Sequence, residues 1–126
     1  MYLIDSNLLI YSSQSKFAYL RPLLVQADAS ISEISCLETL GYHQLNDKDE
    51  RYFKSLFALM PIRVIDSYTI AKAIQLRQIR RMSVGDAIIA ATAMVNGLDL
   101  YTHNVQDFRW IEGIKVIDPI LHSENS

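Results

Sequence analysis

The chain has 126 residues, of which 50% are hydrophobic and 21% are charged. This length suits one domain with a single core, and the composition is ordinary for a globular protein. The net charge of −2 argues against a general nucleic-acid coat protein, but an enzyme that binds nucleic acid through a cation stays compatible with it. The lone cysteine, Cys36, excludes a disulfide framework and a zinc site built from cysteines.

The sequence pattern contains neither a secretory signal nor a membrane span. Residues 1–4 are typical of a strand rather than of a basic leader, and the longest apolar run, residues 87–95, is too short to cross a bilayer. We therefore expect a cytoplasmic protein with no membrane contact.

The first residues predict a strand that ends at a polar cluster. Residues 1–4 form an apolar run of the kind found in strands that are buried on both faces of a sheet. The run stops at Asp5-Ser6-Asn7, and an apolar segment over residues 8–11 then predicts a helix. Asp5 or Ser6 alone would be enough to cap that helix. Because ligands bind at the carboxyl ends of strands in open α/β sheets, three polar residues here indicate a possible site.

The middle of the chain alternates between helical and strand patterns. We expect the apolar positions of the helix after Ser32, among them Ile34, Leu37 and Leu45, to face the core. In chain order the pattern predicts a helix over residues 20–26, a strand over 29–31, a helix over 34–45 capped by Ser32, a helix from Asp47 to about Pro61, a strand over 62–65 and a helix over 68–81 capped by Ser67.

Residues 83–97 predict a helix with both of its ends marked. Ser83 is a suitable N-cap, Asp86 follows three residues later, and Gly97 suits the position just after the helix. The residues between the caps are apolar or small, so the helix should be covered on nearly all sides. Asp86 has two interpretations: it caps the helix and complements its dipole, or it belongs to a group of carboxylates that holds a metal ion.

The last part of the chain completes an α/β pattern. It predicts strands over residues 98–101 and 114–117, a polar loop with a short helical turn over 102–108, and a frayed tail over 120–126. Strands that alternate with helices predict a three-layer α/β/α fold with a central parallel sheet of about five strands. We expect one domain over residues 1–119.

Three aspartates each lie just beyond a predicted strand end or one helical turn away from one: Asp5, Asp86 and Asp107. Carboxylates that are brought together repel one another and need a cation, and a site made only of oxygens favours Mg²⁺ or Mn²⁺. Glu33 and Glu38 flank the apolar stripe of their helix at similar angles, so helical geometry does not choose between them as a fourth acid. The histidines, His43, His103 and His122, are scattered and are not expected to be ligands.

Several short motifs resemble those of the PIN-domain nucleases and occur in the same order along nearly the whole chain. The length and the lack of an added domain resemble the VapC-type toxins of bacterial and archaeal toxin–antitoxin pairs. The motifs are Asp5-Ser6-Asn7, residues 31–40 with Glu38 six residues after Ser32, residues 85–93 with Asp86, residues 102–108 with Asp107, and a closing strand at 112–119.

The resemblance implies a set of functional residues. Two positions depart from the family pattern, because Gly85 stands where many relatives have proline and His103 stands where arginine is frequent. Neither departure removes an acid. The implied catalytic acids are Asp5, Glu38, Asp86 and Asp107, with Asp5, Asp86 and Asp107 as metal ligands and with Ser6, Asn7, Thr102 and Asn104 as polar groups that support the acids or orient a phosphate.

The activity that the resemblance implies is a Mg²⁺- or Mn²⁺-dependent endoribonuclease, with an RNA substrate, a protein antitoxin that blocks the site, and a homodimeric assembly. The main alternative is a non-catalytic PIN-like module that binds RNA or a protein, although such a module need not keep all four acids. A receiver-like phosphoacceptor is a weaker alternative, because no suitably placed lysine follows the fourth strand. Four basic residues before Asp86 fit either RNA contact or a solvated helix face: Lys72, Arg77, Arg80 and Arg81.

Overall fold

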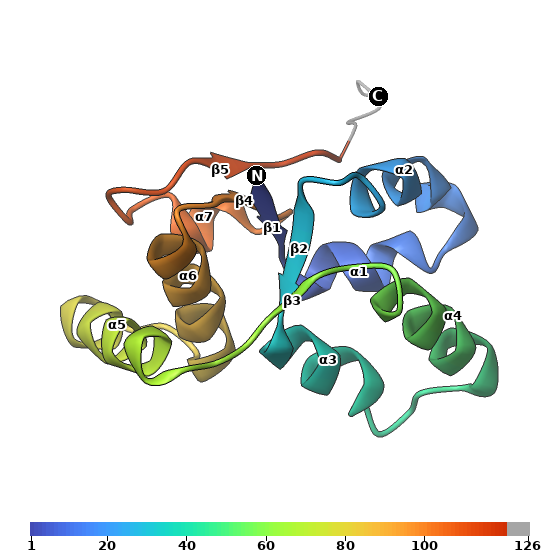
Figure 1. Ribbon diagram of the computed structural model, residues 1–126, viewed down its shortest axis with the longest axis horizontal. Helices are drawn as coiled ribbons and strands as arrows, with labels where there is room; N and C mark the ends of the chain where they lie inside the picture. Colours follow the sequence, from blue (N-terminus) through green and yellow to red (C-terminus); the bar gives the residue numbers. More distant parts are fainter. Residues whose placement is uncertain (121–126) are drawn as a thin grey trace.

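The computed structural model describes residues 1–120, and it contains a parallel sheet between layers of helices (Figure 1). No helix within this range is long and apolar enough to span a membrane. The elements are β1 (Tyr2–Ile4), α1 (Ser6–Ser12), the 3₁₀ helix η1 (Ser15–Leu20), α2 (Arg21–Leu24), β2 (Ala29–Ser32), α3 (Glu33–Leu40), α4 (Asp47–Phe57), β3 (Ile62–Arg63), α5 (Ser67–Ile79), α6 (Val84–Asn96), β4 (Asp99–Tyr101), α7 (Val105–Phe108) and β5 (Val116–Ile117).

The sheet confirms the predicted fold class. Its strand order is β3-β2-β1-β4-β5, and every neighbouring pair is parallel. The chain adds β2 and β3 on one side of β1 and then returns to add β4 and β5 on the other side. Such a reversal of strand order leaves a crevice at the carboxyl ends of the strands, which is where open α/β sheets bind ligands. Asp5 directly follows β1, the central strand.

Successive residues of the central strand pack into two separate cores on opposite faces of the sheet. Leu3 packs into a cluster with α5, α6 and α7, whereas Ile4 packs into a cluster with α1, α2 and α4. Figure 1 shows the same division, with α5 and α6 on one side of the sheet and α1, α2 and α4 on the other. Both residues are fully buried, as expected for a strand that is covered on both faces.

Helix α6 contains a continuous buried segment, and its predicted ends are confirmed. Ser83 Oγ accepts a hydrogen bond from the Asp86 N–H at 3.0 Å, so it caps the helix. Gly97 ends the helix in the left-handed region with φ 64°, where a residue without Cβ is favoured. Residues 87–93 between these caps are all buried. The caps and the covered helix together fix where Asp86 emerges at its first turn.

Helix α3 differs from the prediction in its length and in the side chains that it buries. Helix α3 ends at Leu40 and not at Leu45, because Gly41 takes its C-terminal position. The expected apolar stripe is wrong at Leu37, which is 66% exposed, whereas Ile34 and Leu45 pack against the core as expected. The fully buried positions of α3 are Ser35 and Thr39. Small polar side chains therefore face α1 and the other neighbours of α3, and they allow a close approach.

The cap of α5 and the shorter strands also differ from the prediction. Asp66, and not Ser67, caps α5, because its Oδ1 accepts a hydrogen bond from the Thr69 N–H at 2.9 Å. Strands β3 and β5 each pair over two residues only. At the end of the described range Ile120 packs against the core, while the rest of the expected tail, residues 121–126, lies outside it together with His122.

Candidate active site

Asp5 is held in a buried position at the end of β1. Its backbone N–H donates to the Tyr101 carbonyl of β4 at 2.9 Å, so the residue continues the sheet pairing. Its carboxylate accepts hydrogen bonds from the Ser6 N–H and from Thr102 Oγ1, each at 2.7 Å. Asp5 is only 5% exposed. It therefore caps α1, as predicted, and is also fixed toward the crevice between β1 and β4.

The environment of Asp5 favours its protonated form. Burial is the largest effect and raises its pKa to about 6, although the hydrogen bonds from Thr102 and Ser6 act in the opposite direction. The negative charges of Asp86 and Glu38 raise the pKa further. The three acids are thus close enough to repel one another, and a bound cation would relieve this repulsion.

Glu38 reaches this group from α3, whereas Glu33 does not. The Ser6 hydroxyl lies 2.7 Å from Glu38 Oε1 and 2.8 Å from Ser35 Oγ, which ties α3 to the start of α1. Glu33 Oε1 instead accepts a hydrogen bond from the Ile65 N–H, just beyond β3, at 3.1 Å. The geometry places Glu38 beside Asp5, and it gives Glu33 a separate structural contact.

Gly85 makes room for the Glu38 carboxylate. A Cβ atom at residue 85 would lie 2.5 Å from Glu38 Oε2, which is closer than non-bonded atoms approach. The glycine at this position thus has a local packing reason in this chain. Any other residue there, proline included, would require the Glu38 carboxylate to move.

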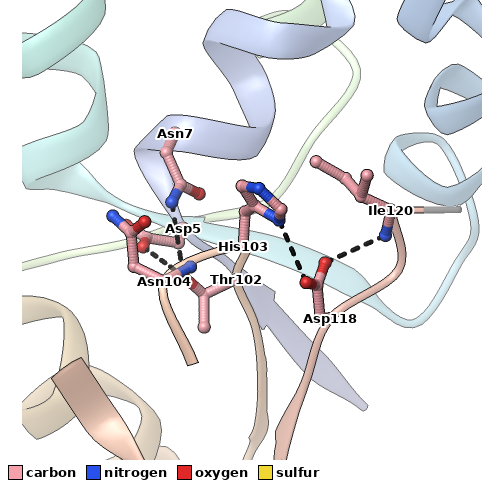
Figure 2. Close-up of polar contacts among 7 residues, drawn as sticks. All are labelled: Asp5, Asn7, Thr102, His103, Asn104, Asp118 and Ile120. Carbon is pink, nitrogen blue, oxygen red and sulfur yellow. Dashed lines mark hydrogen bonds and ion pairs between the residues drawn. The ribbon is translucent and has the colours of Figure 1, made fainter. Parts of the chain in front are cut away.

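Thr102 connects Asp5 to the other predicted polar groups (Figure 2). Its Oγ1 atom accepts hydrogen bonds from the Asn104 N–H at 3.0 Å and from Asn7 Nδ2 at 3.4 Å while it donates to Asp5. Among residues 1–120, the buried Asn7 Oδ1 atom finds no hydrogen-bond partner. An acceptor left in this state is suited to a cation or to the water molecules around one.

Asp86 and Asp107 line one cleft with a volume of about 540 Å³, and neither Asp5 nor Glu38 is among its lining residues. Burial, followed by the charges of Asp107 and Glu38, raises the pKa of Asp86. Asp107 lies on α7, where its backbone N–H donates to the Asn104 carbonyl at 3.0 Å. The Asp86 backbone N–H is thus bound by Ser83 at the start of α6, while the residue also borders a cleft, so a role at the helix start does not exclude a role as a metal ligand.

The arrangement of the acids suits a hydrated divalent ion. Within the described part of the chain, no three His, Cys, Asp or Glu side chains form a ready-made cage for a metal ion. Mg²⁺ does not require one, because it is commonly bound by one or two carboxylates and completes its shell with water and phosphate oxygens. The oxygen-only donors, the mutually repelling acids and the unpaired Asn7 Oδ1 fit this mode. The predicted ligands Asp5, Asp86 and Asp107 remain the natural candidates.

His103 pairs with Asp118, in the segment after β5. Its Nδ1 atom lies 3.0 Å from Asp118 Oδ2 (Figure 2). Its ring packs edge-on against Tyr11. The Asp118 carboxylate also accepts a hydrogen bond from the Ile120 N–H. His103 thus contacts the segment after β5, and it also lines a pocket with Asn104 and Asp107, so it borders the predicted site.

Two residues that support the site were not predicted from the sequence. Ser35 is fully buried and lies beside Ser6, and its position one helical turn before Glu38 was the available indication. Asp118 partners His103, and nothing in the local sequence distinguishes it from an ordinary aspartate before proline. Residues of this kind are found only when distant segments are brought together.

Comparison with known proteins agrees with this geometry. A family model described as "PIN domain" matches residues 2–112. The chain is 32% identical over 126 residues to "Ribonuclease VapC1" of Rickettsia felis, covering 91% of this chain and 93% of that protein. A solved structure titled "Toxin-antitoxin complex from Klebsiella pneumoniae" superposes with a TM-score of 0.78 at 28% identity and covers 97% of this chain and 100% of that one. The structure of VapBC2 from Rickettsia felis shares the fold, with a TM-score of 0.77 at 18% identity over 93% of this chain and 97% of that one. The chain therefore belongs to the PIN-domain family and, within it, to the VapC proteins.

Proposed function

We propose that this protein is a Mg²⁺- or Mn²⁺-dependent endoribonuclease that hydrolyses phosphodiester bonds of RNA. The observation that supports this most directly is the convergence of acids from separate segments at the carboxyl end of the central strand. The relatives named as VapC ribonucleases agree with it.

Each part of the site has a role in this reaction. A bound divalent ion supplies charge neutralisation at the phosphate and makes water a better nucleophile at neutral pH. Asp5, Asp86 and Asp107 would hold the ion, and Glu38 would orient water through its carboxylate beside Ser6. Thr102 fixes the Asp5 carboxylate by donating to it, and Asn7 and Asn104 surround Thr102. The buried hydrogen bonds keep these groups oriented before substrate binds, so little reorganisation is needed during the reaction.

The relatives also support a biological role. The solved neighbours include toxin–antitoxin complexes, so we infer that this chain is the toxin of such a pair and that a protein antitoxin blocks the cleft. A homodimer is part of the same proposal. Repulsion among the acids means that a positively charged antitoxin side chain would find a favourable position there.

Cleavage should depend on both the ion and the acids. Purified protein is expected to cut single-stranded RNA with Mg²⁺ or Mn²⁺, to stop with EDTA, and to recover when the ion is restored. Asp86→Asn should lower the rate by about 100-fold or more, since it removes a charge that the ion requires. Asp99→Asn is the matched control, because Asp99 begins β4 at the opposite end of the sheet. RNA that is bound but never cut with either ion would favour the non-catalytic binding module.

Expression without an antitoxin should arrest bacterial growth. The expected cause is RNA cleavage, so Asp86→Asn expressed at an equal soluble level should let the culture grow. Optical density after induction, together with the amount of soluble protein, provides the measurement. Equal arrest by the wild type and by soluble Asp86→Asn would contradict the toxin proposal.

A further inference from the structure

The cleft that contains Asp86 and Asp107 also has a wall of opposite charge. Its other lining residues include Arg77, Arg80 and Arg81, from the end of α5 and the loop that follows it, together with Trp110. Acids and guanidinium groups thus share one cleft. A ligand that fits this cleft must carry negative charge to pair with the arginines, and it must also bind a cation that the acids can hold. A phosphodiester with a divalent ion has this chemistry.

The arginines are not neutralised by protein carboxylates. Within residues 1–120 the ion pairs are Lys54–Glu50 and His103–Asp118, so no acid lies at salt-bridge distance from any of the three. Arg77 Nε donates a hydrogen bond to the Met82 carbonyl at 3.2 Å. This bond ties the Arg77 side chain to the turn before α6. Arg80 and Arg81 are exposed and keep their charge for a ligand.

Trp110 provides a fixed flat surface beside these charges. Its Nε1–H donates to the Asp107 carbonyl at 3.0 Å, which anchors the indole next to a predicted metal ligand. The Arg80 guanidinium lies 5.4 Å from the indole centroid, within the range of a cation–π contact. Lys72 lines a different pocket that also includes Trp110, and it does not line the cleft with the acids. The cleft thus combines a stacking surface with two available cations.

We propose, building on the nuclease function above, that Arg80, Arg81 and Trp110 form a binding subsite for the nucleotide next to the scissile phosphate. Arg80 and Arg81 bind the backbone phosphate of this nucleotide, and its base takes the place of the Arg80 guanidinium on the Trp110 indole. A base can reach the indole only when it is unpaired, because bases within a duplex are already stacked on one another. The subsite therefore selects single-stranded RNA and tolerates different bases, since every base has a π-face.

The protein contains its own reporter for this subsite, because Trp110 is the only tryptophan. Intrinsic fluorescence is measured in EDTA, which prevents cleavage, while a short single-stranded oligouridylate is added. Stacking of a base on the indole should quench the emission. The same oligouridylate annealed to oligoadenylate should quench much less, and inorganic tripolyphosphate, which carries charge without a base, should not quench.

Variants separate the contributions of stacking and charge, with affinity measured as the anisotropy of a labelled oligouridylate. Trp110→Ala should weaken binding by about tenfold, whereas Trp110→Phe should keep most of the affinity because a ring remains. Both variants lose the hydrogen bond to Asp107, so their difference isolates stacking. Arg80→Gln should also weaken binding by about tenfold and reduce the slope of log affinity against log salt by about one. Arg51→Gln, on α4 across the sheet, is the matched charge control.

The outcomes test the subsite separately from the nuclease function. Equal affinities of the wild type, Arg80→Gln and Trp110→Ala, each with a native melting transition, would overturn the subsite even if cleavage with Mg²⁺ or Mn²⁺ is normal. Equal quenching by duplex and single strand would overturn the selection of unpaired bases. Loss of binding in both variants, with Arg51→Gln unaffected, supports the subsite, and it does so even if the protein never cuts RNA.

Discussion

Asp5→Asn is expected to abolish RNA cleavage and, at the same time, to stabilise the metal-free protein at neutral pH. The loss of activity should be about 100-fold or more, because the variant cannot place a negative charge on the ion at the end of β1. The gain in stability follows from the environment of Asp5, which is buried and close to Asp86 and Glu38. An amide removes the buried charge, and its oxygen can still accept one of the two hydrogen bonds made to the carboxylate.

The sign of the pH dependence follows from the pKa of Asp5. Its pKa is about 6 in the folded protein against an ordinary value of 3.8, so the folded state binds the proton more tightly. Without metal, the contribution of Asp5 to the free energy of unfolding should therefore fall as pH rises from about 4 to about 6, and it should fall no further above that window. A shift of this size corresponds to a difference on the order of 3 kcal/mol. The difference between Asp5→Asn and the wild type should grow across this window.

Urea unfolding in EDTA at several pH values, followed by circular dichroism, provides the measurement. Asp99→Asn serves again as the matched control, because it removes a carboxylate at the other end of the sheet. Addition of Mg²⁺ should raise the stability of the wild type more than that of Asp5→Asn. A wild type that becomes more stable between about pH 4 and about pH 6 relative to Asp5→Asn would contradict the buried, repelled state of this carboxylate.

The sheet and the first acid could be predicted because their causes are local. The apolar run before Asp5 is long enough for one buried strand, and the polar residues after it mark the point where the strand ends. The caps at Ser83 and Gly97 likewise fixed the limits of α6 in advance. Strand order was not in these local patterns, but alternation of strands and helices restricted the sheet to a parallel arrangement.

The inward face of α3 could not be predicted in the same way, because its neighbours are distant in sequence. Periodicity assigned Leu37 to the core, yet Leu37 is exposed. The most deeply buried side chains of the helix are instead Ser35 and Thr39, and α3 contacts both α1 and α6. The shared cleft of Arg80 and Trp110 was missed for the same reason, because a cation and an aromatic ring thirty positions apart give no local pattern.

Glu38→Gln and Glu33→Gln are expected to differ in their effects on cleavage and on metal binding, although both residues have similar positions on the predicted helix. The Glu38 carboxylate lies beside the Ser6 hydroxyl and against Gly85, and its charge raises the pKa of both Asp5 and Asp86. Its amide analogue fits the same space but loses the charge. Cleavage should fall by about 100-fold, and the increase in melting temperature produced by Mn²⁺ should shrink.

Glu33→Gln should retain cleavage and the Mn²⁺-induced shift in melting temperature. The Glu33 side chain serves the fold through Oε1, which accepts a hydrogen bond from the Ile65 N–H, and a glutamine oxygen can accept the same bond. The cost to the free energy of unfolding should be at most about 1 kcal/mol, from the lost negative charge at the start of α3.

The two variants make a matched pair, because each replaces one glutamate of the same helix with its amide. Melting temperatures are measured with EDTA and with Mn²⁺, and cleavage rates are measured on the same preparations. In EDTA, Glu38→Gln should melt at or above the wild-type temperature, since one source of repulsion among the acids has been removed. If the Mn²⁺-induced shift persists in Glu38→Gln and disappears in Glu33→Gln, the fourth acid is Glu33, and the contact between Glu38 and Ser6 serves only to hold α3 against α1.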